Sequence, residues 1–162
     1  MRPAAGFTLI EILVVMVILG VLATSVALTL PDQALRERLA SLEQWQRQAV
    51  QVARLAETRS MTLAWEVGAR QVRALERQQG EWVEMGAVPG LPRPVLALAE
   101  GLAVSAIEID GLGVPPASRI VFAGGEAPLF VVRIAGAGRT WRLAGLVSGA
   151  IRLEEQEQGL PR

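Results

Sequence analysis

Apolar residues dominate the first part of the chain and then give way to two periodic patterns. From Phe7 to Leu30 only Glu11 carries a charge. Residues 32–60 contain no Gly or Pro, and their apolar positions recur at the spacing of an amphipathic helix. From Met61 onward apolar positions alternate with polar or small ones, which is the period of a half-buried strand. The sequence therefore predicts an α+β fold in which a long amino-terminal helix leads into a small antiparallel β domain.

The amphipathic helix predicted over residues 32–60 has one apolar face. Its members are Leu35, Leu39, Leu42, Trp45, Ala49, Val52, Ala53 and Ala56. Charged residues occupy the opposite face at Arg36, Glu43, Arg47 and Arg54. We expect the apolar face to pack on the sheet of the same domain, and a seam for a partner helix is the alternative.

The β domain is predicted over residues 61–153, with a polar tail over residues 154–162. Its strands are divided by turns at Gly68-Ala69, Gln78-Gln79-Gly80, Gly124-Gly125 and Gly136-Ala137-Gly138. Two segments rich in Pro and Gly, Val88–Pro94 and Asp110–Ser118, are predicted to be loops. The alternating tryptophans of this domain are interpreted as core residues rather than exposed contacts; they are Trp65, Trp82 and Trp141.

The composition excludes several kinds of chemistry. The chain has no Cys and no His, so disulfides, Cys/His metal sites and His-dependent catalysis are excluded. Acidic pairs such as Glu81 and Glu84 have the spacing of solvated strand edges rather than of an acid/base pair. We therefore expect no enzyme, no cofactor and no metal site.

The charge pattern does not favour nucleic acid as a partner. The chain has 16 basic and 16 acidic residues, so its formal net charge is zero, and Glu154, Glu155 and Glu157 make the tail acidic. Three arginines, at positions 70, 73 and 77, lie close together on one strand. We interpret them as a solvated strand face, with a small basic patch as the alternative.

The apolar run is long enough to cross a membrane. A helix from Phe7 to Leu30 would span about 36 Å, against about 30 Å for a bilayer core. A cleaved secretory signal requires a shorter apolar core, and a plain signal anchor is a second alternative. Thr8 and Glu11 match a capping box, which accounts for the acid locally. The box does not explain why the helix begins at the entrance to the membrane.

The stretch Gly6-Phe7-Thr8-Leu9-Ile10-Glu11, followed by an apolar run, resembles the amino terminus of type IV pilins and pseudopilins. The resemblance implies that a prepilin peptidase removes Met1–Gly6 and that Phe7 becomes the N-methylated terminus. It also implies that Glu11 pairs with the amino terminus of a neighbouring subunit during filament assembly. A lone carboxylate in lipid costs up to about 3 kcal/mol, so this pairing would favour the assembled state.

One feature departs from the pilin pattern. Many members of that class kink the apolar helix with an internal proline, whereas the first proline here after the leader is Pro31. The kink geometry of that class is therefore not carried over to this helix.

The remainder of the chain resembles the GspH/FimT-type minor subunits. The resemblance covers most of residues 32–153 and rests on the order of helix, WEV strand, hairpin and Pro-rich loop, and on the segment Val121–Pro128. Such subunits occur as H-type minor pseudopilins in type II secretion and also in type IV pili. The resemblance thus implies a pilin-like fold.

Both resemblances together imply a minor pseudopilin of the type II secretion system, a structural subunit near the tip of the periplasmic pseudopilus that helps to export folded proteins across the outer membrane. The implied partners are other minor pseudopilins, the major pseudopilin, the prepilin peptidase, inner-membrane lipid before assembly, and secreted cargo. Residues 7–31 would be the membrane and filament-core helix, with a cytoplasmic amino terminus and a periplasmic carboxy-terminal domain. The alternative is a minor pilin of a type IV pilus, acting in assembly priming or DNA uptake.

Overall fold

The computed structural model describes residues 9–29, 33–123 and 128–156. The chain divides into two compact units, Met1–Arg36 and Glu37–Arg162. The first unit contains helix α1 (Leu9–Thr29) and the beginning of helix α2 (Gln33–Arg59). The second unit contains the rest of α2 and all the strands described below.

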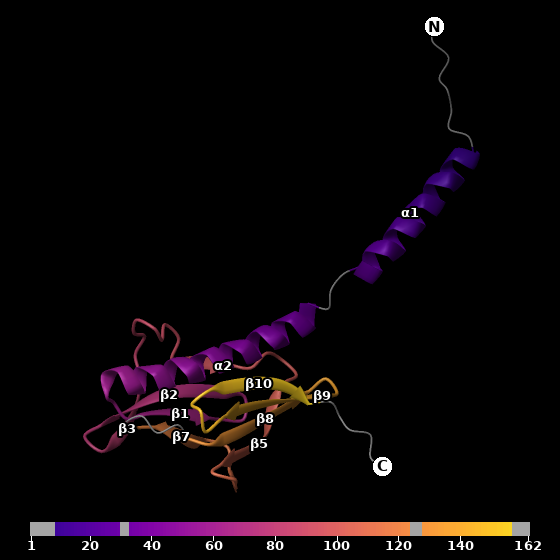
Figure 1. Ribbon diagram of the computed structural model, residues 1–162. Helices are drawn as coiled ribbons and strands as arrows, with labels where there is room; N and C mark the ends of the chain where they lie inside the picture. The colour runs from indigo at the N-terminus through magenta and orange to yellow at the C-terminus, as the bar shows by residue number, and fades with distance from the viewer. Residues whose placement is uncertain (1–8, 30–32, 124–127, 157–162) are drawn as a thin grey trace, which may run out of the picture. The chain divides into compact units, whose positions relative to one another are not determined.

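Helix α2 packs on the strands of its own unit along most of its length (Figure 1). Its buried residues are Ser41, Leu42, Trp45, Gln48, Ala49, Val52, Leu55 and Ala56. This confirms the expectation that the apolar face covers the domain's own sheet. Leu39 was expected on the same face, but its side chain is 37% exposed because burial begins only at Ser41.

The first sheet is antiparallel and contains five strands. They are β1 (Leu63–Val67), β2 (Gln71–Gln78), β3 (Glu81–Glu84), β4 (Val95–Ala97) and β7 (Ser118–Phe122). The order is β3-β2-β1-β7, and β4 pairs with the first residues of β2 while β3 pairs with the last. All five residues of β1 are buried, and β1 is a central strand between β2 and β7.

The second sheet is also antiparallel. It contains β5 (Ala103–Ile109), β6 (Leu112–Val114), β8 (Phe130–Gly136), β9 (Arg139–Gly145) and β10 (Ile151–Gln156), in the order β10-β9-β8-β5-β6. A two-residue turn joins β8 to β9, and its residues Ala137 and Gly138 have φ angles of 51° and 73°. Two consecutive positive φ angles are typical of a type I′ hairpin turn, so the predicted turn is confirmed here.

Aromatic side chains connect the helix to both sheets. The ring of Trp45 on α2 lies 5.9 Å from that of Trp65 on β1, and Trp65 lies 6.1 Å from Phe130 on β8. Phe130 in turn contacts Phe122 on β7 at 6.5 Å. Because offset or edge-on aromatic pairs add to the free energy of burial, this chain of rings ties the three layers into one core.

Three boundaries in the β domain differ from the sequence predictions. Strand β6 lies inside the predicted loop Asp110–Ser118, because Asp110 and Gly111 form a tight turn with φ angles of 51° and 78°. Strand β10 continues to Gln156, so the predicted start of the tail at residue 154 is wrong; its acidic residues pair with arginines of β9. The predicted turn at Gly124-Gly125 lies outside the described residues.

The predicted loop Val88–Pro94 contributes to the core. Leu91 is fully buried, and the carbonyl of Pro94 accepts a hydrogen bond from the Ala74 amide of β2 at 2.8 Å. Strand β4, which the sequence did not reveal, begins immediately after this loop. The loop therefore leads the chain along the edge of β2 rather than away from the domain.

Candidate functional site

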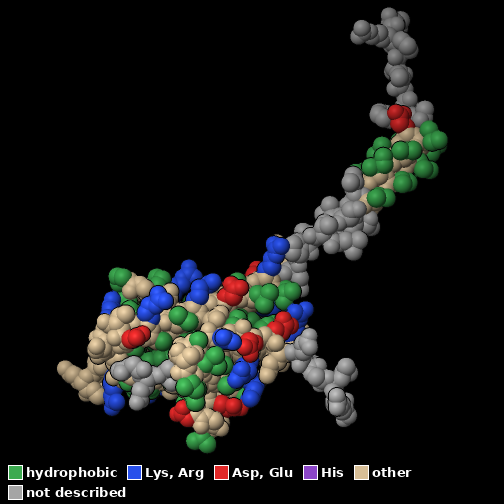
Figure 2. Space-filling model, viewed as in Figure 1, with side chains coloured by type: hydrophobic (Ala, Val, Ile, Leu, Met, Phe, Trp, Pro, Cys, Tyr) green, Lys and Arg blue, Asp and Glu red, His purple; other side chains and the backbone are tan. Residues whose placement is uncertain are grey.

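Glu11 is the predicted assembly residue that the structure describes. It lies in the first turn of α1, where a carboxylate meets the positive end of the helix dipole. The apolar side chains around it are exposed, with Ile10 at 71% and Ile12 at 51%. Figure 2 shows apolar side chains covering the described surface of α1. The helix thus presents one carboxylate within an apolar surface.

The other residues predicted at this site are Gly6, Phe7 and Thr8, which lie outside the described residues. Cleavage after Gly6, methylation of Phe7 and capping by Thr8 therefore stay predictions. In the part of the chain that the structure describes, no helix meets the length and hydropathy required of a membrane-crossing segment.

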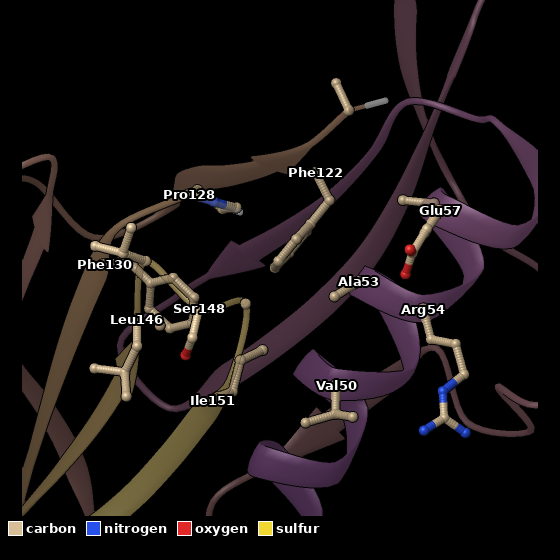
Figure 3. Close-up of a pocket in the computed structure, with 15 residues that line it drawn as sticks. Val50, Ala53, Arg54, Glu57, Phe122, Pro128, Phe130, Leu146, Ser148 and Ile151 are labelled. Carbon is tan, nitrogen blue, oxygen red and sulfur yellow. The ribbon is translucent and has the colours of Figure 1, made fainter. Parts of the chain in front are cut away.

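A groove opens on the surface of the second unit, beside the carboxy-terminal half of α2 (Figure 3). Its volume is about 400 Å³, within the range of sites that accept small ligands or a few side chains of a partner. Phe122, Phe130 and Ile151 form apolar walls, while Arg54 and Glu57 lie on the helix side. The apolar side chains that form its walls are buried, whereas Arg54 and Glu57 are exposed at its margin.

A buried glutamine fixes the helix against the first sheet. Gln48 is only 2% exposed, and its side-chain oxygen accepts a hydrogen bond from the Trp65 indole at 2.8 Å. Its amide group donates to the carbonyl of Arg93 in the Pro-rich loop, also at 2.8 Å. One side chain therefore holds the helix, β1 and the loop together. This role of Gln48 was not predicted from the sequence, although a polar residue within the apolar face of α2 could have indicated it.

A second polar cluster lies on the outer face of the first sheet. Glu66 on β1 is buried between Arg73 on β2 and Arg119 on β7. Its two carboxylate oxygens bind Arg73 Nη2 at 2.5 Å and Arg119 Nε at 2.9 Å. The side chains of both arginines remain nearly half-exposed, at 41% and 45%. One buried negative charge thus holds two positive charges at the surface.

The structure bears on the predicted arginine cluster and on the tryptophans. Arg73 is paired with Glu66, and Arg77 lies over the ring of Trp82 with its guanidinium carbon 5.8 Å from the ring centroid. Trp65 and Trp141 are core residues as predicted. Trp82 is only half-buried, so its assignment to the core is wrong; it lies on the edge strand β3 and stacks with Arg77 instead.

The described acidic residues do not converge. No group of three or more Asp or Glu side chains among them is arranged to hold a metal ion. The ion pairs of the second sheet link neighbouring strands, and those of Arg133 with Glu108 and of Arg139 with Glu155 run diagonally across the ladder, since Arg133 lies opposite Ala106 and Glu155 opposite Trp141.

Comparison with known proteins supports the two resemblances separately. The model of the prokaryotic N-terminal methylation motif matches residues 1–27. The solved structure of the minor pseudopilin EpsH from the type 2 secretion system of Vibrio cholerae is similar over 72% of this chain and 94% of that chain. The TM-score is 0.55 and the sequence identity is 20%. No curated protein matches the sequence.

The two matches concern different features of the chain, one its amino-terminal motif and the other its fold. The motif match concerns the amino-terminal segment that contains Gly6, Phe7 and Glu11. The structural match shows that the helix and the two antiparallel sheets have the fold of a minor pseudopilin, which confirms the predicted α+β, pilin-like architecture.

Proposed function

We propose that this chain is a minor pseudopilin of a type II secretion system, a structural subunit of the periplasmic pseudopilus rather than an enzyme. The observation that carries the proposal is the presence, in one chain, of a prepilin-type methylation motif and a domain with the minor-pseudopilin fold. Each feature alone would be compatible with other roles. Together they fit a subunit that is processed at its amino terminus and presents a folded domain outside the membrane.

The proposed site of processing is the bond between Gly6 and Phe7. Prepilin peptidase removes Met1–Gly6 and Phe7 is methylated. Until assembly, the apolar segment 7–31 anchors the subunit in the inner membrane, with the second unit in the periplasm. The exposed apolar surface of α1 supports this part of the proposal, because a helix that is apolar on every side needs lipid or other helices around it.

Glu11 is the proposed assembly residue. In lipid its carboxylate would be costly, and the cationic amino terminus of a neighbouring subunit would compensate that cost. Other minor pseudopilins and the major pseudopilin are the proposed neighbours. The groove between Phe122 and Ile151 is a proposed contact for one of them, since the exposed side chains of Arg54 and Glu57 line it.

Mass spectrometry of the protein purified from cells that contain prepilin peptidase tests the processing step. We expect a mature amino terminus at Phe7 with one added methyl group. Retention of Met1, or cleavage within residues 22–32, would refute the pilin-type assignment. A matched Gly6→Val variant should remain unprocessed, because a side chain at this position obstructs the backbone in the protease.

The secretion role is tested in the bacterium that carries the gene. Deletion should leave folded exoproteins in the periplasm, and the wild-type gene should restore their export. Loss of surface pili or of DNA uptake with normal protein export would instead identify a type IV minor pilin. The processing experiment would succeed in both cases, so the two tests separate the class of the protein from its system.

A further inference from the structure

Strand β7 is an edge strand, and its outer side is not paired with any strand that the structure describes. It pairs with β1 on its inner side, where Val67, Trp65 and Leu63 lie opposite Ser118, Ile120 and Phe122. An unpaired edge carries a row of backbone donors and acceptors that can bind another extended chain.

The hydrogen bonding between β1 and β2 determines which residues of β7 direct their backbone groups away from β1. The Arg77 amide donates to the carbonyl of Thr62, and in an antiparallel ladder such bonds recur at every second residue. Ala64 and Glu66 therefore bond to β2, and the odd-numbered residues of β1 bond to β7. On β7 the residues opposite them use their backbone groups toward β1. The N–H and C=O groups of Arg119 and Val121 consequently point outward.

The side chains of the same two residues lie on the outer face of the sheet. Arg119 is opposite Glu66, and Val121 is opposite Ala64. Both β7 side chains are accessible, Val121 at 39% and the Arg119 side chain at 45%. At Arg119 and Val121, therefore, both the outward-pointing backbone groups and the side chain are available to a partner at the edge of β7.

The charge at this edge is positive. Glu66 balances one of the two arginines that bind it, so the cluster of Arg73, Glu66 and Arg119 has a net charge of +1. Arg119 uses its Nε for Glu66, which fixes the guanidinium group beside the edge. A carboxylate on an added strand opposite Arg119 would meet a cation whose position is already set.

We propose that the outer edge of β7 binds an extended segment of another protein by antiparallel strand addition, and that this segment has an aliphatic residue opposite Val121 and an acidic residue opposite Arg119. In an antiparallel partner the aliphatic residue comes first and the acid follows two positions later, because both must lie on the same face. The partner motif is therefore aliphatic-x-acid in an extended conformation. The binding site goes beyond the assembly role of α1 and does not depend on it.

A second copy of this chain fits the edge less well. If two β7 strands paired about a twofold axis centred on Ile120, each Arg119 would lie opposite the partner's Val121, and both surplus positive charges would remain uncompensated. If the axis passed through position 119, the two arginines would face each other. An acidic partner removes the surplus charge instead, which favours a different protein.

Peptide binding to the full chain in detergent micelles tests the proposal. The probe is the labelled peptide Ser-Thr-Val-Thr-Glu-Thr-Ser, and its two controls replace Glu by Lys or carry N-methyl groups on the amides that face the edge. We expect the acidic probe to bind, and both control peptides to bind with an affinity lower by roughly tenfold or more, as measured by fluorescence anisotropy. Binding should also slow hydrogen exchange at the Arg119 and Val121 amides. Equal affinity for the Glu and Lys peptides would overturn the proposal.

Variants of β7 sharpen the test. Val121→Pro removes an outward N–H without removing a bond to β1, so it should abolish probe binding, whereas Val121→Ala should retain most of it. Arg119→Glu should reverse the preference, so that the Lys peptide binds more tightly than the Glu peptide. This variant tests the proposal even if Val121→Pro does not fold. Arg139→Gln, on β9, is the control that should bind normally. Self-association that Val121→Pro abolishes, without probe binding, would assign the edge to a second copy and overturn the proposal.

Discussion

Helix α1 and the second unit differ in the exposure of their apolar side chains. In α1 the described apolar side chains are exposed, and the acid Glu11 is among them. In the second unit most large apolar side chains are buried, and the buried polar side chains Gln48 and Glu66 have specific partners within the same fold. The second unit thus has a core of its own, whereas the described side chains of α1 form no such core. Assembly and folding should accordingly depend on different residues.

Replacing Glu11 by Ala should break assembly alone. Without the carboxylate the neighbouring amino terminus has no anionic partner, so we expect the variant to lose most of its incorporation into filaments. All four tryptophans lie at position 45 or later, so tryptophan fluorescence reports on the second unit. Unfolding followed by this signal should be unchanged. The measurement is the amount of subunit in sheared filaments relative to the membrane fraction.

Met16→Ala is a matched control for this experiment, because Met16 is an exposed apolar residue of the same helix. It should assemble nearly as well as the wild type. Normal incorporation of the Glu11 variant would contradict the pairing of Glu11 with an amino terminus, while leaving the processing at Gly6 untouched.

Trp65→Phe should have the largest effect on folding. It removes the indole that donates to Gln48 and leaves the Gln48 oxygen buried without that donor. Trp45→Phe is the matched control, because no protein acceptor for Trp45 Nε1 is found among the described residues. We expect Trp65→Phe to lower the free energy of unfolding by about 1–3 kcal/mol more than Trp45→Phe does. Urea unfolding followed by circular dichroism measures both.

The double variant Gln48→Met/Trp65→Phe isolates the hydrogen bond. Its loss of stability should be smaller than the sum of the two single losses, since the second substitution removes a group that the first left without a partner. Additive losses would show that ring volume rather than the hydrogen bond decides the cost.

Glu66→Gln should have an intermediate effect. The substitution removes the charge that holds Arg73 and Arg119 but keeps nearly the same volume. We expect a loss of about 1–3 kcal/mol in the free energy of unfolding, because Glu66 is buried and accepts two charge-assisted hydrogen bonds. Glu108→Gln is the control: Glu108 is more exposed and pairs only with Arg133 among the described residues, so a smaller loss is expected. Equal losses would show that burial of Glu66 does not strengthen its ion pairs.

The sequence predicted the parts of this molecule that depend on local order. Hairpin turns such as Ala137-Gly138 require positive φ angles, and the apolar face of α2 follows from a period that is visible in any short window. The position of Glu11 was also readable, because the motif around it is contiguous. The partner proposed for it, the amino terminus of another subunit, was accessible only through the resemblance to pilins.

Long-range partners were not predictable in the same way. Glu66 is separated from Arg119 by 53 residues, and nothing in the local pattern of β1 distinguishes it from a solvated acid. Strand β4 was hidden by the preceding prolines, since it forms only where the loop brings it against β2. Sheet order, and with it the place of β7 at an edge among the described strands, depends on such pairings. A single sequence contains no direct signal for them.

Arg139→Gln should have the smallest effect. The Arg139 and Glu155 side chains are 48% and 45% exposed, so water and salt screen the 3.1 Å pair between them. We expect a change of about 0–1 kcal/mol in the free energy of unfolding, and a double-mutant cycle with Glu155→Gln should give a coupling that decreases at high salt. A larger coupling that persists in salt would mean that this ion pair holds the last residues of β10. A negligible coupling would leave the backbone ladder with β9 and the packing of Leu153 as the reasons that β10 continues to Gln156.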